Sequence, residues 1–81
     1  MTDEELFARI GDLVDEEHRL EADAHPGRPL AEDQAERLAQ LEVALDQCWD
    51  LLRQRRARRN AGQDPDDAHV RPANVVENYQ Q

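Results

Sequence analysis

The chain has few of the residues that stabilise small domains. It contains one cysteine, Cys48, so no disulfide can form within the chain. It has one Phe, one Trp and one Tyr among 81 residues, while 36% of its residues are charged. A chain of this length forms one domain at most, and so little aromatic material leaves only a small hydrophobic core. We therefore expect no enclosed active site of the conventional kind.

Long apolar runs are also missing from the sequence. No stretch approaches the roughly 18 apolar residues that a membrane-spanning helix needs. The N-terminal sequence MTDEELFARI has neither the basic start nor the apolar stretch of a secretory signal. The sequence therefore predicts a cytoplasmic protein with no membrane partner.

Positive charge is scarce and unevenly distributed. Lysine is absent, and the chain contains ten arginines and 19 acidic residues, which gives a net charge of -9. Half of the arginines fall between Arg53 and Arg59, and without these five charges the rest of the chain stands at -14. One basic segment on an acidic molecule indicates an interaction, within the chain or with a partner, rather than a reaction.

A first helix is predicted over residues 3–24. Thr2, followed three residues later by Glu5, is typical of a capping box, and acidic residues in the first turn favour the positive end of the helix dipole. Apolar residues then recur in alternating steps of four and three, with Glu17 interrupting them. This apolar stripe comprises Leu6, Ile10, Leu13 and Leu20. Gly11 lies within the helix at a cost of about 1 kcal/mol relative to alanine, which indicates a close approach of another helix.

A turn is predicted over residues 25–30, where two prolines and Gly27 interrupt any helix. A second helix is predicted over residues 32–60. Gln34 is placed as a capping-box partner, although Ala31 offers no side-chain oxygen at the cap. The apolar stripe continues with the same three-four spacing through Leu38, Leu41, Leu45, Cys48 and Leu52. The sequence Asn60-Ala61-Gly62 predicts the end of this helix.

These elements predict an all-α fold. Residues 1–62 form an antiparallel two-helix hairpin, similar to a coiled coil, in which Arg55 and Arg56 lie level with the acidic first turn at Asp3. Residues 63–81 form an extended or partly disordered tail. The large apolar residues of this tail either remain in solvent or dock along the hairpin. They are Val70, Val75, Val76 and Tyr79.

A two-helix layer covers only one side of each apolar stripe. Four apolar residues lie at the edges of the stripes, where a second layer would pack. They are Phe7, Val14, Trp49 and Leu51. We expect a homodimer that forms a four-helix bundle, with a different protein partner as the alternative.

The arginine-rich end of the second helix is the candidate binding site. Its residues are Trp49, Arg53, Arg55, Arg56, Arg58 and Arg59. One interpretation is a patch that binds an acidic protein partner, which makes the chain an adaptor. The alternative is binding to RNA, for example within a ribosome, because arginine forms paired bonds to phosphate. In the third interpretation the arginines only pair with nearby acids, namely Asp3, Glu4, Glu5, Asp50, Asp64, Asp66 and Asp67.

No set of residues predicts catalysis, a metal site or a cofactor. His18, Glu17, Glu21 and His25 include metal-ligand residue types, but Asp15 and His18 fall on the outward face of the first helix. Cys48 lies on the apolar stripe without a nearby histidine, so a buried thiol is expected. Glu17 either fixes the register of the hairpin by pairing with an arginine such as Arg37, or lies in a wet part of the seam. The sequence therefore predicts a non-enzymatic protein.

Two segments resemble a known family. The segment LDQCWDLLRQRRARRNAGQDPDDAHVRP, with VVENY close behind it, resembles the hallmark stretch of a small, mostly actinobacterial family catalogued as a domain of unknown function (family 2630). The opening ELFARIGDLVDEEHRLEA is similar to that family's first segment. The family usually has Ser, Thr or Asp near the start of the second helix, where this chain has Ala31. The resemblance implies a small, stand-alone cytoplasmic protein and carries over no catalytic residue.

Overall fold

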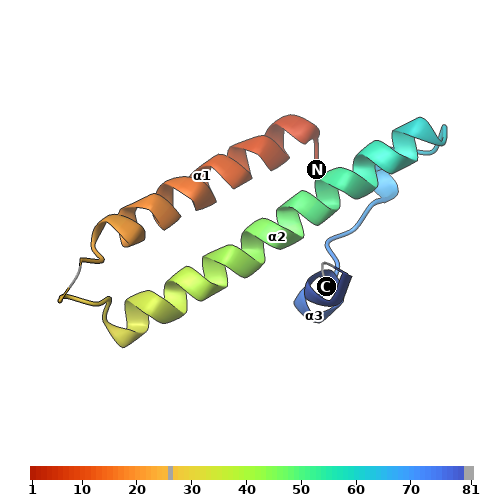
Figure 1. Cartoon of the computed structure of the whole chain (residues 1–81). Helices are drawn as coiled ribbons and strands as arrows, with labels where there is room; N and C mark the ends of the chain where they lie inside the picture. The colour runs from red at the N-terminus through yellow and green to blue at the C-terminus, as the bar shows by residue number, and fades with distance from the viewer. Residues whose placement is uncertain (26, 80–81) are drawn as a thin grey trace.

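The protein is built from two long helices followed by a short folded tail (Figure 1). Its structure is a computed structural model, which describes residues 1–25 and 27–79. The elements are α1 (Asp3–Ala22), α2 (Glu32–Asn60), the 3-10 turn η1 (Pro65–Asp67) and α3 (Ala73–Tyr79). The molecule is elongated, with principal extents of 53 × 26 × 16 Å, because the length of α2 sets its long axis.

Helix α1 begins at the predicted capping box. The Thr2 hydroxyl accepts the backbone N–H of Glu5 at 3.1 Å, and the Glu5 carboxylate accepts the N–H of Thr2 at 3.2 Å. The bond from the Thr2 N–H and then a bond from the Thr2 side chain favour the charged carboxylate and lower the pKa of Glu5. The helix ends at Ala22, two residues before the predicted end at residue 24. Asp23 and Ala24 form i to i-3 backbone bonds of 3.1 Å, which tighten the last turn.

The connection between the helices is a tight turn. Arg28 donates its N–H to the carbonyl of His25 at 2.9 Å, and Gly27 has a φ of +82°, a conformation that glycine adopts without strain. Pro26, which belongs to the predicted turn, lies outside the described residues. Helix α2 then starts with half of a capping box, because the Gln34 side chain accepts the N–H of Ala31 at 3.0 Å while Ala31 has no oxygen to return the bond.

Helix α2 ends where the sequence predicted. Gly62 has a φ of +72°, and Gln63 donates its N–H back to the carbonyl of Arg58 at 2.7 Å. A glycine in this conformation lets the chain reverse and satisfies carbonyls that the end of the helix leaves unpaired. Charged residues recur along both long helices. In the described part of the chain, no helix is both long and apolar enough to cross a membrane.

The hydrophobic core lies along the seam between α1 and α2. Its buried members are Leu6, Ile10, Leu13, Leu41, Leu45, Leu51 and Leu52. At the open end of the hairpin the Arg55 guanidinium lies 2.6 Å from the Asp3 carboxylate. This contact confirms the predicted register of the hairpin, because it places the end of α2 level with the start of α1. The all-α, two-helix prediction is confirmed.

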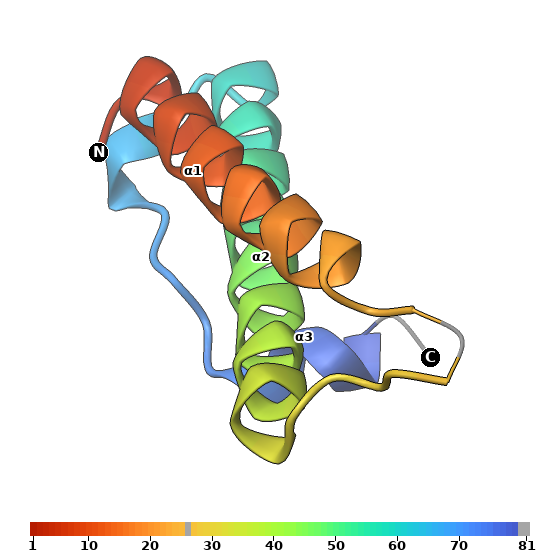
Figure 2. The same ribbon diagram turned by 90° about the vertical axis from the view of Figure 1, so that its left-hand side faces the viewer.

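The sequence predicted an extended or partly disordered tail that either stays in solvent or docks along the hairpin, and in the structure the tail docks on α2 and contains the short elements η1 and α3. It passes behind α2 in Figure 1 and then forms α3, which crosses α2 (Figures 1 and 2). The side-chain amide of Gln54 donates to the carbonyl of His69 at 2.8 Å, and that of Gln47 donates to the carbonyl of Arg71 at 3.2 Å. Val76 is only 1% exposed. Polar side chains of α2 thus bind the tail backbone, while Val76 anchors α3. The tail residues that make these contacts follow no helical or strand periodicity, so the sequence pattern did not predict them.

Only part of the tail's apolar content is buried. Val70 and Val75 remain exposed, while Ala68 packs against the core. The side chain of Tyr79 lies outside the described residues. The tail covers Leu51, one of the four edge residues, which is 5% exposed. The chain therefore supplies part of its own second layer.

Candidate interaction surface

Helix α2 presents three faces, because successive residues are about 100° apart around its axis. Leu41, Leu45 and Leu52 face α1. A second face binds the tail through the side chains of Gln47, Asp50 and Gln54. The third face carries Trp49, Arg53 and Arg56, which are all exposed. Trp49 is two positions from Gln47, so it lies about 200° around the helix from the tail contact.

The same side of the hairpin is uncovered on α1. A cavity of about 140 Å³ is lined jointly by Arg9, Leu51 and Val70, so the tail runs along the Arg9 side of α1. Phe7 and Gly11 are each two positions from Arg9, which places them about 200° around α1, on the side away from the tail. We call the surface away from the tail the open face. It consists of Phe7, Gly11, Val14, Trp49, Arg56 and, at its border with the tail, Arg53, which lines a hollow with Asp50 and Arg71.

The open face holds the largest exposed aromatic groups of the described residues. Phe7 is 52% exposed and Trp49 is 41% exposed, whereas Val14 is half-buried. The link from η1 to α3 passes behind α2 in Figure 1, and α3 then runs beneath α2 toward the side of the viewer (Figures 1 and 2). Of the edge residues predicted to need a second layer, the chain covers Leu51 and leaves Phe7 and Trp49 in solvent.

Arg55 does not belong to a partner-facing patch, and its assignment to one was wrong. It is 6% exposed and donates to Asp3 at 2.6 Å, to Asp66 at 3.0 Å and to the carbonyl of Pro65 at 3.2 Å. Hydrogen bonds to Asp3 and then Asp66 raise the pKa of Arg55. Its position continues the apolar stripe that faces α1, so its side chain is directed into the molecule. Arg55 therefore joins α1, α2 and η1.

The other arginines of the candidate site differ in their surroundings. Arg59 also binds Asp3, at 2.8 Å, and hydrogen bonds from Arg55 and then Arg59 lower the pKa of Asp3. Arg58 is half-buried. Arg53 and Arg56 are exposed, and neither forms an ion pair with a described residue. Pairing with local acids thus accounts for Arg55 and Arg59 and leaves Arg53 and Arg56 available on the open face.

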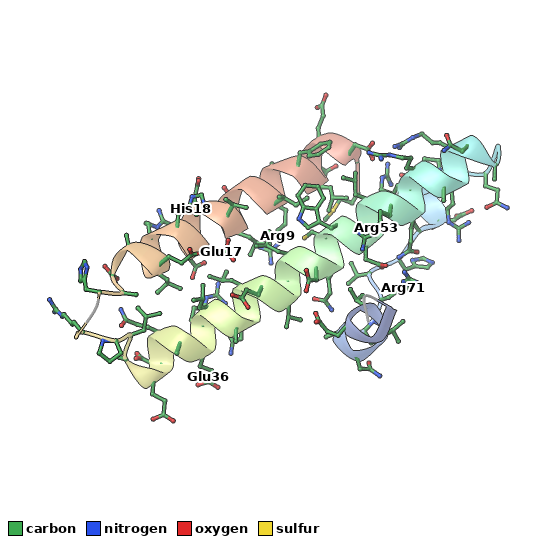
Figure 3. The ribbon with its side chains drawn as sticks, in the orientation of Figure 1. Arg9, Glu17, His18, Glu36, Arg53 and Arg71 are labelled. Atoms are coloured by element: carbon green, nitrogen blue, oxygen red, sulfur yellow. The ribbon has the colours of Figure 1, made fainter. Side chains whose placement is uncertain are left out.

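Asp50 pairs with Arg71 of the tail, a partner that was not predicted from the sequence. Figure 3 labels Arg71, on the tail beside α2. The Asp50 side chain is 1% exposed, and it accepts hydrogen bonds from Arg71 Nε at 2.8 Å and Gln54 Nε2 at 2.9 Å, with a second bond from the Arg71 guanidinium. The Arg71 bonds lower the pKa of Asp50, against the opposing effect of burial. The available signal was Arg71 itself, the one arginine in an otherwise acidic tail.

Arg37 pairs with Glu16 rather than with Glu17. The guanidinium binds both oxygens of Glu16, at 2.7 and 2.9 Å, and the hydrogen bond from Arg37 lowers the pKa of Glu16. Both glutamates are half-buried, and Glu16 lies about 100° around α1 from Glu17, where the long Arg37 side chain reaches it. The proposed pairing of Glu17 with Arg37 was therefore wrong by one position.

Cys48 is partly buried in the seam, and burial raises the pKa of its thiol. A raised pKa disfavours the thiolate, which is the reactive form. Among residues 1–25 and 27–79, no three His, Cys, Asp or Glu side chains lie close enough together to hold a metal ion.

The position of Glu77 beside Asp46 predicts that the docking of α3 depends on pH. A hydrogen bond with Asp46 of α2, with burial and the Asp46 charge, raises the pKa of Glu77 above its ordinary value of 4.5. The folded tail therefore holds this proton more tightly than the undocked tail does. The protonated Glu77 side chain contributes fully to docking at low pH, and this contribution is lost as the pH rises through the raised pKa of Glu77. We expect amide hydrogen exchange in α3 to slow as the pH falls from neutrality through the raised pKa of Glu77, after correction for the intrinsic exchange rate.

The matched variant for this prediction is Glu77→Gln, which keeps a hydrogen bond with Asp46 and has no charge to repel it. The variant should protect α3 at neutral pH about as well as the native chain does in mild acid, and its protection should not vary over the same pH range. Equal pH dependence in the two chains would show that Asp46 and Glu77 do not control docking.

Comparison with known proteins finds one matching family and several similar proteins. A family model described as "Protein of unknown function (DUF2630)" matches residues 2–81. Uncharacterized proteins of Mycobacterium bovis and of two Mycobacterium tuberculosis strains are each 51% identical to the chain over 78 residues. These matches cover 96% of the chain and 90% of each relative. No solved structure matches it.

Proposed function

Since the chain belongs to the family described as protein of unknown function DUF2630, we propose its function from its own surface: it is a non-enzymatic interaction module that binds a protein through the open face. The observation that carries this proposal is the exposed Trp49 beside Arg53 and Arg56 on one side of a 29-residue helix. Trp and Arg are the residue types most enriched among those that dominate binding energy in protein interfaces.

The chemistry of the open face favours a partner that presents carboxylates next to an apolar surface. Trp49 offers an aromatic contact, while Arg53 and Arg56 can each form paired hydrogen bonds to a carboxylate. The face is rigid because α2 is held by α1 on one side and by the tail on another. A rigid binding surface loses little conformational entropy on association.

The proposed site is narrower than the arginine-rich end predicted from sequence. Arg55 is buried, and Arg59 is engaged with Asp3. The binding residues are Trp49, Arg53 and Arg56, with Arg58 at the edge. Arg55 and Arg59 support the site by holding the end of α2 against α1.

A pull-down from the native host tests this proposal. We expect the double change Arg53→Glu and Arg56→Glu to abolish capture of the partner, because it reverses the charge of the face that meets the carboxylates. The matched control is Arg19→Glu with Arg28→Glu, which alters net charge equally at exposed residues near the other end of the hairpin. Capture that both variants retain would exclude the open face as the binding site.

RNA binding through the same arginines is the competing function, and a salt titration separates the two. Binding to phosphates releases counterions, so RNA affinity would fall steeply with salt concentration. We expect no measurable binding to single-stranded or duplex RNA even at low salt, because the net charge of -9 repels a free nucleic acid. RNA binding that is lost in the Arg53→Glu, Arg56→Glu variant would favour this competing function.

A further inference from the structure

The open face is self-complementary, and we propose that its occupant is a second copy of the chain. The two copies pack open face to open face about a two-fold axis parallel to α1 and α2, which gives a four-helix bundle. This inference rests on the proposed function and names its partner. It is argued from three features of the open face: an uncovered aromatic surface, a glycine without a neighbour and complementary charges.

The first feature is the unequal cover of the hairpin. A two-helix layer needs a second layer to bury both edges of its apolar stripe. On one side the tail supplies this layer and leaves Leu51 only 5% exposed. On the other side Phe7 and Trp49 remain 52% and 41% exposed. Packing two open faces together covers both aromatic side chains in each copy.

The second feature is Gly11. A β-carbon at this position would meet nothing within 4 Å, so packing inside the chain does not require a glycine there. The Arg55–Asp3 contact shows which residues of α1 and α2 lie opposite each other along the hairpin. Counting six residues back along α2 from Arg55 and six forward along α1 from Asp3 places Trp49 opposite Arg9. Trp49 is therefore level with the interval between Phe7 and Gly11. A two-fold axis parallel to the helices preserves these levels and places each indole over the partner's Gly11.

The third feature is the charge of the open end of the hairpin. By the same count Arg53 is level with Glu5, and Arg56 is level with Thr2, at the acidic first turn of α1. Within each chain Asp3 is already bound to Arg55 and Arg59, whereas Glu4 is exposed. The two-fold axis brings Arg56 of each copy next to the partner's Glu4. These contacts occur twice in the dimer, so each change to one chain acts twice.

The first test uses Gly11→Gln, with Ala8→Gln as the matched control. Residue 8 is exposed and lies on the part of α1 turned away from α2. Sedimentation equilibrium at about 0.15 M salt, where net repulsion between the copies is screened beyond about 8 Å, should find a dimer for the native chain and for Ala8→Gln. Gly11→Gln should raise the dissociation constant at least about 30-fold with its helix content unchanged.

A native chain that stays monomeric at about 100 μM would overturn the proposal, because a specific bundle interface should hold well below that concentration. Equal dimerisation of the Gly11→Gln and Ala8→Gln variants would also overturn it by excluding the open face. Circular dichroism of both variants shows whether each is folded, so a loss of dimer caused by unfolding is recognised.

The second test exchanges charges between copies. Glu4→Arg alone places two arginines together at each contact, and Arg56→Glu alone places two glutamates together, so both variants should dimerise more weakly than the native chain. When the two variants are mixed, the heterodimer has an attractive pair at both contacts. We expect mixing to restore dimer formation to within about threefold of the native dissociation constant. Mixing without restoration would exclude this arrangement.

These outcomes are separable from the test of the proposed function. A native chain that is monomeric but captures a host protein through Arg53 and Arg56 would leave the interaction module standing and remove the second copy as its partner. A native dimer whose dissociation constant does not change with substitutions on the open face would show that the second copy binds elsewhere.

Discussion

Replacement of Leu41 with alanine is expected to lower the free energy of unfolding by about 2 to 5 kcal/mol, the largest effect of any single change considered. Leu41 is 1% exposed and packs in the seam between α1 and α2. Shortening the side chain removes its apolar contacts and leaves a cavity that the two rigid helices cannot fully close. In a chain with one phenylalanine and seven buried core leucines and isoleucines, this loss removes most of the stability of a small domain.

Chemical denaturation followed by helical circular dichroism measures this effect at a fixed protein concentration, since association would add to the apparent stability. The control is Leu20→Ala, which removes the same atoms from a residue that is only partly buried. We expect the Leu20 change to cost less than half as much as the Leu41 change. Similar losses at the two positions would mean that the core is not concentrated in the middle of the hairpin.

Replacement of Arg71 with alanine is expected to release the tail, at a cost of about 1 to 3 kcal/mol. Asp50 would lose the guanidinium that compensates its burial, and a buried carboxylate without its cation is unfavourable. The tail can move away and let water reach Asp50, so the cost is limited to the free energy of docking. Limited proteolysis should cut the chain after residue 61 faster, while the hairpin stays folded.

The matched control for the tail is Arg53→Ala, which removes an exposed arginine near Asp50 that forms no ion pair with a described residue. It should leave proteolysis of the tail unchanged. Acid provides a second check, because the lowered pKa of Asp50 means that its contribution is present at neutral pH and is lost as the pH falls through that pKa, below the ordinary value of 3.8. Unchanged proteolysis of the Arg71→Ala variant would show that apolar contacts alone hold the tail.

Local sequence signals predicted the hairpin because each signal acts over three or four residues. The Thr2–Glu5 capping box, the apolar stripes with their three-four spacing and the Gly62 stop are all confirmed. The position of Arg55 opposite Asp3 was predicted by counting residues along each helix from the turn. Such features depend on helix geometry, which is nearly independent of what surrounds the helix.

The candidate site was predicted less well, because a cluster of arginines in sequence is dispersed around a helix. Arg55 continues the buried stripe, whereas Arg53 and Arg56 lie on the open face, and one or two positions decide between them. The spacing did contain this information for Arg55, because position 55 continues the three-four spacing of Leu45, Cys48 and Leu52. It could not show that Asp3 and Asp66 would both bind the Arg55 guanidinium.

The sequence by itself determined the two helices, both of their starts and the end of α2, their antiparallel pairing and the membership of the chain in its family. Only the tertiary structure decided that the tail folds back, which edge of the hairpin it covers and which arginines stay exposed. The physical reason is that these features depend on pairs far apart in the chain, such as Asp50 with Arg71 and Arg55 with Asp66. No helical or strand period connects such pairs, and their free energy appears only when separate segments meet.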